Sequence, residues 1–414
     1  MKLGEVWNAD ALDRGKPLDG VTILAVEQMQ ALPFGTMLLA RLGADVVRVE
    51  HPRDGESGRG SVPFMVDADG RRAGATFVRN ALGKRSVGID LKHPDGKRLV
   101  KELAPHFDVF CENFKAGTMR RLGLAWDDIR AVHPTVVYAS VSGFGNTVAS
   151  QYDAWPAYAP IAEAMSGLYE YKRTGDHPPV VGPAGALGDI SAAMFATIGV
   201  LAALRQRDRT GEAQYVDIAM YDSMVAMADL VVNFWSMGLR GDRTAPLIMD
   251  GFRAKDGWFI VQVGREHQFE RLAHTLGHPE WVSDPRFATR DGWRTHLEDV
   301  IRPALEGWAA TRTRFEACDV LARDGIAAGP CYTPEDIVAD PHVAARAMLV
   351  EVPRTDGETD PVLVPGNPVK ISGVAQGPET YPATVGEHTD EVLTSVLGLG
   401  DADLAALRAS GAIT

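Results

Sequence analysis

The residue best placed to do chemistry is Asp189, which follows the glycine-rich segment GPAGALG and precedes a long apolar stretch. An ionised carboxylate can attack an activated acyl group when a substrate reaches it. Residues 190–204 are almost all apolar or small, which predicts a buried helix, and three arginines before Gly211 predict its end. The alternative is that Asp189 only caps this helix. This stretch alone leaves both interpretations open.

Basic residues lie near several predicted loops, and such residues can hold phosphates by charge-assisted hydrogen bonds. They stand out because the chain carries 42 Lys and Arg against 55 Asp and Glu, a net charge of −13. This balance argues against a nucleic-acid-binding protein but allows one small anionic ligand in a local basic patch. For each single residue, a solvated surface position is the alternative. The residues concerned are Lys84, Arg85, Lys92, Lys115, Arg120 and Arg121.

Strand and helix patterns alternate through the first 145 residues. Strands are predicted at residues 21–28, 44–52, 86–91, 107–112 and 135–145, with helices at 31–42, 94–103 and 122–132 between them. This alternation predicts a doubly wound α/β domain, in which ligands bind at the carboxyl ends of the strands. Residues 54–74 are predicted to form a surface loop. The glycine motifs of dinucleotide and P-loop sites are missing from the first turn.

The second half of the chain predicts a further, smaller domain. In this interpretation, residues 221–237 form one long apolar helix. Asp217 and Asp222 are possible acids or bases, but their positions at a strand end and a helix start explain both without a catalytic role. A hairpin with its turn at residues 255–257 and helices at 268–276, 296–310 and 314–324 then indicate an α+β domain. We expect a large domain from residues 1–225, a small domain from 226–330, and a C-terminal segment from 331–414.

The cysteines and the apolar runs bear on the cellular compartment. Three cysteines, Cys111, Cys318 and Cys331, do not suggest a disulfide framework and favour a reducing cytoplasm; Cys331 is expected to be buried. No signal peptide is visible, and no apolar run is expected to reach the roughly 18 residues that span a bilayer. We therefore expect a cytoplasmic protein that does not enter a membrane.

Taken together, several motifs resemble the class III CoA-transferases, a family that also includes the α-methylacyl-CoA racemases. The resemblance covers about residues 17–414 and rests on LARLGADVVRVEHP, GKRSVGIDLKHPDGKRLV, ENFKAGTMRRLGL, GALGDISAAM and TGEAQYVDIAMYD, among others. It implies a Rossmann-like large domain built from both chain ends, a small domain, and an interlocked homodimer. It also implies coenzyme A as a substrate, a small carboxylic acid as its partner, and no tightly bound cofactor or metal.

The resemblance assigns roles to individual residues. Asp189 becomes the nucleophile, which forms a mixed anhydride and then an aspartyl-CoA thioester. Backbone N–H groups of the glycine loops would stabilise the oxyanion. His51 stands where some members carry a CoA-contacting arginine. The other residues implied in CoA binding are Gln30, Ala31, Ile89, Lys92, Asn113, Phe114, Lys115, Arg121 and Leu122.

Departures from the family pattern bear on the reaction. The racemases use a histidine where this chain has Tyr158, supported by a glutamate that matches Glu266. A tyrosine with a pKa near 10 is a poor base at neutral pH, so transfer is favoured over racemisation. A non-catalytic CoA-binding protein is the remaining alternative. The acid that often follows the matched tyrosine is Ala159, and the missing glycine-run loop puts oxalate and formate in doubt as substrates.

Overall fold

The chain folds into two compact units in the computed structural model. The structure describes residues 1–171, 175–182, 185–228, 230–238 and 247–414. Unit 1 comprises Met1–Ser236 and Ala344–Thr414, and unit 2 comprises Met237–Val343. The boundaries after residues 236 and 343 lie later in the chain than the predicted 225 and 330.

Unit 1 is built on a six-stranded sheet in the order β5-β2-β1-β6-β7-β8, with every neighbouring pair parallel. Numbered along the sheet's own strands, this is the 3-2-1-4-5-6 order of doubly wound folds. The predicted α/β architecture with a parallel sheet is therefore confirmed. The strands are β1 (Thr22–Val26), β2 (Asp45–Glu50), β5 (Lys84–Gly88), β6 (Val109–Glu112), β7 (Val137–Ser142) and β8 (Gln214–Ala219).

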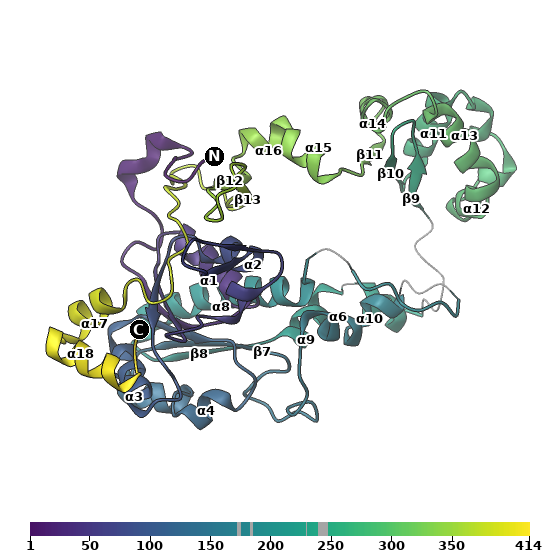
Figure 1. Cartoon of the computed structure of the whole chain (residues 1–414). Helices are drawn as coiled ribbons and strands as arrows, with labels where there is room; N and C mark the ends of the chain where they lie inside the picture. Colours follow the sequence, from purple (N-terminus) through teal and green to yellow (C-terminus); the bar gives the residue numbers. More distant parts are fainter. Residues whose placement is uncertain (172–174, 183–184, 229, 239–246) are drawn as a thin grey trace. The chain divides into compact units, whose positions relative to one another are not determined.

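Helices cover both faces of this sheet (Figure 1). Successive strand residues point to opposite faces, so Ile23 and Ala25 of β1 join one apolar cluster and Leu24 and Val26 join the other. The first cluster also contains residues of α1 (Pro33–Arg41) and α8 (Leu187–Thr210). The second contains residues of α3 (Pro94–Leu103), α5 (Trp126–Val132), α17 (Thr389–Leu397) and α18 (Asp401–Ser410).

The C-terminal segment packs against the carboxyl end of β5. Asp90 donates its N–H to the carbonyl of Ala412 at 2.9 Å, and Thr414 donates to the carbonyl of Gly88 at 3.1 Å. A Cβ atom on Gly88 would lie 1.7 Å from Thr414 Oγ1, so this approach requires glycine. The last residues thus brace one of the predicted ligand-binding loops.

The long apolar helix differs from its prediction in two respects. Residues Leu187, Met194 and Ile198 are about half exposed, so α8 is buried on one side only. It has 24 residues and contains an 18-residue window with a mean hydropathy of 1.8, so it is long and apolar enough to cross a bilayer, contrary to the expectation that no run reaches that length. Half of that apolar window is buried inside the protein. Core helices of folded domains meet the same criteria, so α8 carries no membrane assignment.

Two other segments were predicted wrongly. The supposed loop at residues 54–74 contains a short hairpin of β3 (Phe64–Val66) and β4 (Arg72–Gly74), whose three-residue strands are too short to show a pattern. The supposed single helix at 221–237 is divided into α9 (Met220–Met227) and α10 (Leu230–Ser236). Ala228, the buried residue after α9, leaves the helical conformation with ψ at 31°. The remaining helices of the site region are α2 (Ala75–Ala81), α4 (Thr118–Leu122), α6 (Ala159–Met165) and α7 (Leu168–Tyr171).

Unit 2 has its own core around a three-stranded sheet. The predicted hairpin is confirmed: β9 (Ile248–Arg253) pairs antiparallel with β10 (Trp258–Val263), and Ala254 donates to the carbonyl of Gly257 across the turn. The predicted helices correspond to α11 (Glu266–Leu276), α13 (Arg302–Ala309) and α14 (Arg314–Arg323). The rest of the second half comprises α12 (Arg290–Thr295), β11 (Ala327–Pro330), α15 (Pro334–Ala339), α16 (Pro341–Ala345), β12 (Leu349–Val352) and β13 (Val362–Pro365).

Candidate active site

Two adjoining cavities lie along the carboxyl ends of the unit 1 strands. The larger is about 830 Å³ and the smaller about 450 Å³, both within the range of small-molecule sites. Gln28 and Phe114 line both cavities, so the two spaces meet at these residues. A long ligand could therefore occupy both at once.

The smaller cavity brings together the predicted nucleophile and several of the residues predicted to bind CoA. Asp189 contributes to its wall together with Tyr158, whose side chain is largely exposed. The walls also include the glycine loop that follows β7. The predicted CoA-contacting residues in this wall are Gln30, Ala31, Asn113, Phe114 and Lys115.

Asp189 is the third residue of α8 and does not cap it. The N-cap position is Ala186, which offers no side-chain hydrogen bond, so the capping interpretation is wrong. Gly188 explains the helix start, because a Cβ atom there would lie 2.9 Å from the Cα and the carbonyl oxygen of Ala159 on α6. Only glycine lets the two helices approach so closely. The turn that carries Asp189 is therefore placed by packing.

The electrostatic surroundings of Asp189 oppose its ionisation. Burial first, and the negative charge of Glu163 second, raise its pKa from 3.8 to about 6. Within the described part of the chain, no group donates a hydrogen bond to this carboxylate. The N-terminus of a helix favours the ionised form of a carboxylate, but burial and the second carboxylate outweigh that effect at Asp189.

The loop after β1 is held by side chains from two neighbouring loops. The Asn113 side chain accepts the N–H of Gln28 at 2.9 Å and donates to its carbonyl at 2.8 Å. Met29 has a φ of 60°, rare for a residue with a side chain, and donates its N–H to Glu56 at 2.9 Å. Asn113 thus positions the segment that carries Gln30 and Ala31, in addition to lining the cavity.

The larger cavity contains three more of the residues predicted to bind CoA. His51, Ile89 and Lys92 line it, together with several arginines that were not predicted. His51 Nδ1 accepts the N–H of Asp54 at 3.2 Å, so part of this side chain serves its own loop. The additional arginines are Arg53, Arg59, Arg71 and Arg72.

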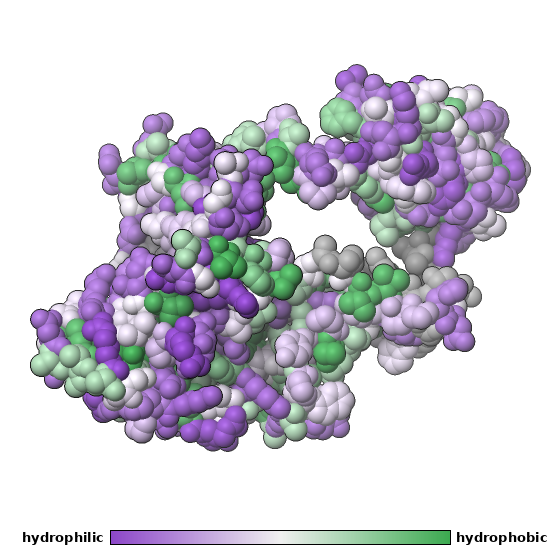
Figure 2. All heavy atoms as spheres, viewed as in Figure 1, coloured by the Kyte–Doolittle hydropathy of each residue, from purple (hydrophilic) through white to green (hydrophobic). Residues whose placement is uncertain are grey.

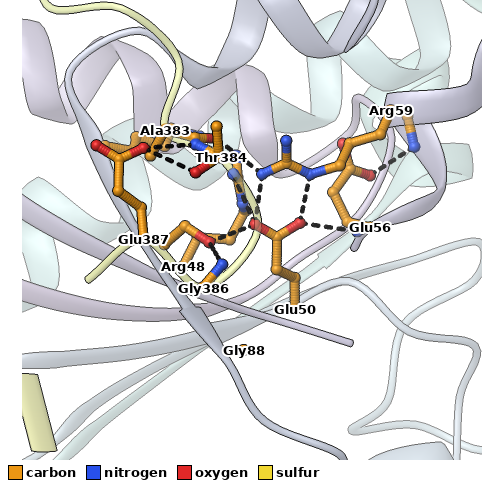
Figure 3. A network of polar contacts seen from close by, with 12 residues as sticks. Arg48, Glu50, Glu56, Arg59, Gly88, Ala383, Thr384, Gly386 and Glu387 are labelled. Atoms are coloured by element: carbon orange, nitrogen blue, oxygen red, sulfur yellow. Dashed lines mark hydrogen bonds and ion pairs between the residues drawn. The ribbon is translucent and has the colours of Figure 1, made fainter. Parts of the chain in front are cut away.

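A buried charge network forms part of the wall of the larger cavity (Figure 3). Arg59 donates to both oxygens of Glu50, at 2.7 and 2.6 Å, and to the carbonyl of Ala383 at 2.9 Å. Arg48 adds a third contact to Glu50 at 3.1 Å. Although burial opposes ionisation, the two arginines lower the pKa of Glu50 from 4.5 to about 2. The network joins β2 to the C-terminal segment.

Asp217 anchors the glycine loop of the smaller cavity. Its carboxylate accepts the N–H of Asn146 and the N–H and hydroxyl of Thr147, all at 2.7–2.8 Å at its second oxygen. It also accepts the hydroxyl of Ser140 at 3.1 Å. The N–H groups of Gly145 and Asn146 are bonded within this region, so the expected oxyanion contact does not fall on these two groups.

Several predicted residues lie elsewhere. Arg121 and Leu122 on α4 line neither cavity; Arg121 donates to Thr118 and Leu122 packs against an apolar cluster. Glu266 lies in unit 2, where it is exposed and paired with Arg290 at 2.8 Å. Lys84 is buried against Glu27 at 2.7 Å, and Arg85 pairs with Asp45 and Glu391, so neither matches the phosphate-binding role considered for it. Cys331 is exposed and not buried.

Sequence reasoning missed Glu163 and underrated Asp217. Glu163 on α6 is 3% exposed and accepts the N–H of Gly188 at 3.0 Å. A glutamate within the apolar segment PIAEAM was a usable signal, because a buried charge needs a partner. Its contact with Gly188 spans 25 residues and could not be seen from spacing.

The family model for CoA-transferase family III matches residues 18–389. The chain belongs to this family. It is 33% identical over 411 residues to a succinyl-CoA–D-citramalate CoA-transferase of Chloroflexus aurantiacus, an alignment covering 96% of this chain and 98% of the relative. It is 34% identical over 385 residues to a succinyl-CoA:mesaconate CoA-transferase of Haloarcula hispanica, covering 91% and 95%.

A solved structure supports the same conclusion. The crystal structure of a CAIB/BAIF family protein from Brucella suis matches with a TM-score of 0.80 and 28% identity, covering 92% of this chain and all of that one. The predicted enzyme class is confirmed: this family III CoA-transferase moves CoA between an acyl-CoA and a carboxylic acid.

Proposed function

We propose that transfer proceeds through covalent intermediates on Asp189. The observation that carries this proposal is that Asp189 lines the smaller cavity together with Gln30, Ala31 and Asn113, and that this cavity meets the larger one at Gln28 and Phe114. A CoA molecule with its nucleotide near His51, Ile89 and Lys92 could direct its thioester toward Asp189. A carboxylate reacts this way only when ionised and accessible.

The proposed reaction needs no net proton transfer. An oxygen of Asp189 bonds to the thioester carbonyl carbon, the C–S bond breaks, and CoA leaves as thiolate. The thiolate then attacks the Asp189 carbonyl carbon, and the first acid leaves as its carboxylate. The incoming carboxylate attacks the aspartyl thioester, which releases the thiolate and forms a second anhydride. Attack of the thiolate on the new acyl carbon yields the product and restores Asp189.

The names of the relatives indicate which substrates to test. Since the two relatives act on succinyl-CoA with a small dicarboxylic acid, succinyl-CoA is the first donor to test. A screen of acyl-CoA donors against acids including citramalate, mesaconate, malate and oxalate, analysed by mass spectrometry, would identify the pair. CoA transfer to an acid supports the proposal. Deuterium exchange at the α-carbon without CoA transfer would favour a racemase. Binding of CoA without either reaction would favour a non-catalytic CoA-binding protein.

We also propose that the chain forms the homodimer implied by the resemblance. Apolar side chains gather at the surface near α8 and α10 (Figure 2), where Met194, Ile198, Val232 and Trp235 are each about half exposed or more. Met and aromatic side chains such as these are enriched at protein interfaces. Sedimentation analysis giving a dimer would support the proposal, and a monomer at micromolar concentration would contradict it. The cytoplasmic location stays a prediction.

A further inference from the structure

The first turn of α8 is held by a second carboxylate. Glu163 lies one helical turn after Ala159 on α6, the residue against which Gly188 packs. Glu163 Oε1 accepts the N–H of Gly188 at 3.0 Å, and the hydroxyl of Tyr169 donates to Glu163 Oε2. Both oxygens therefore face donors, and the side chain is almost completely buried.

We propose that Glu163 is a positioning residue for Asp189. Its carboxylate fixes the turn that presents the nucleophile and places a second negative charge beside it. This inference rests on the proposed role of Asp189. It adds that the reactivity of Asp189 is set by a neighbouring carboxylate as well as by burial.

The second charge favours the first half of the proposed reaction, up to the aspartyl-CoA thioester, in two ways. Repulsion between two carboxylates is relieved when Asp189 becomes a neutral anhydride or thioester. A more basic Asp189 is also the poorer leaving group of the two carboxyl groups in the mixed anhydride. Since ordinary carboxylic acids have a pKa near 4, the substrate carboxylate leaves preferentially when the CoA thiolate attacks. The anhydride is then directed toward the aspartyl-CoA thioester.

Other charged groups surround this turn. Of those described, Glu163 is the one whose charge acts on Asp189, in addition to the burial of Asp189 itself. Arg41 of the adjoining α1 is paired with Glu379 at 2.9 Å. Other titratable groups on the cavity loops and on the elements packed around the turn include Lys115, Asp153, Tyr158, Tyr169, Glu170, Tyr215, Asp217, Tyr221 and Asp222.

The test is the pH dependence of covalent adduct formation at Asp189, measured by rapid quenching and mass spectrometry with succinyl-CoA. Glu163→Gln keeps an oxygen acceptor for Gly188 but removes the charge. We expect its acidic midpoint to move at least about half a pH unit below that of the wild type. We also expect a lower rate at pH 8, because a less basic carboxylate is a weaker nucleophile.

Two further variants separate charge from structure. Glu163→Asp keeps the charge but shortens the reach to Gly188, so it should retain the wild-type midpoint with a lower rate. Glu212→Gln is the matched control, since this exposed residue lies beyond the far end of α8, which rises about 30 Å between Asp189 and Thr210. It should change neither the midpoint nor the rate.

The outcomes distinguish this inference from the proposed function. An adduct on Asp189 with the same midpoint in the wild type and in Glu163→Gln would overturn the positioning role alone. A wild-type enzyme that transfers CoA without any adduct on Asp189 would overturn the proposed mechanism and this inference with it. A midpoint that shifts in Glu163→Gln but stays at the wild-type value in Glu163→Asp supports the role of charge.

Discussion

Two carboxylates in unit 1, the buried Glu50 and the half-buried Asp189, have opposite surroundings. Glu50 is enclosed by Arg48 and Arg59, which lower its pKa to about 2 despite burial. Asp189 has burial and the like charge of Glu163, which raise its pKa to about 6. A buried carboxylate whose charge is compensated joins segments of the fold, as Glu50 does with the C-terminal segment. One that is not compensated stays reactive, because acylation removes an unfavourable charge.

The largest expected effect comes from removing the uncompensated carboxylate. Asp189→Asn should lower CoA transfer by at least about a thousandfold, because the proposed nucleophile is lost. The raised pKa means that ionised Asp189 costs folding free energy above pH 6. The variant should therefore gain about 1–2 kcal/mol in its free energy of unfolding at pH 8. Steady-state kinetics measure the loss of transfer, and urea unfolding measures the gain in stability. A variant that is inactive because it is unfolded would contradict the expected gain.

Glu50→Gln should lower stability strongly and change CoA transfer little, the opposite of Asp189→Asn. It leaves Arg48 and Arg59 buried without their anion, which we expect to lower the free energy of unfolding by about 3–5 kcal/mol. Transfer by the protein that remains folded should change much less than in Asp189→Asn. Thermal and urea unfolding measure the loss. Asp54→Asn, at an exposed pair with Arg53, is the control and should not change stability measurably.

Asp189 and Glu50 should also affect the protein in different pH ranges. The raised pKa of Asp189 predicts that activity falls as the pH drops through about 6, to roughly a tenth of its maximum at pH 5. The lowered pKa of Glu50 means that its stabilising contribution is complete above about pH 4.5 and is lost only as the pH falls toward 2. At pH 5 the enzyme should be folded, weakly active and fully recoverable at pH 8. Activity loss that coincides with unfolding would contradict this separation.

A third carboxylate gives the smallest expected effect. Asp217 is compensated by N–H and hydroxyl donors of the loop that lines the smaller cavity. Asp217→Asn should lower kcat/KM about tenfold, because it weakens the charge-assisted hydrogen bonds that hold this loop. The acidic midpoint near pH 6 should stay unchanged. A shifted midpoint would show that Asp217 acts on Asp189 electrostatically and not through the loop.

The fold was predictable because its signals are local. Alternating strand and helix patterns placed the parallel sheet, and the smaller cavity at its carboxyl edge is lined by seven of the predicted site residues: Gln30, Ala31, Asn113, Phe114, Lys115, Tyr158 and Asp189. What failed depended on contacts between distant segments. The start of α8 is decided by the packing of Gly188 on Ala159, so Asp189 was mistaken for a possible cap. Lys84 was grouped with ligand-binding residues because its buried partner Glu27 lies 57 positions away.

The central claim is that Asp189, which has no compensating cation or hydrogen-bond donor among the residues that the structure describes, becomes covalently modified during transfer. The most direct test is mass spectrometry of the peptide containing Asp189 after acid quenching of the wild-type enzyme with succinyl-CoA, with and without hydroxylamine. The account predicts an acyl or CoA adduct on Asp189, converted to the hydroxamate by hydroxylamine, with half-maximal formation near pH 6. Turnover with an unmodified Asp189, or a modification at another residue, would contradict it.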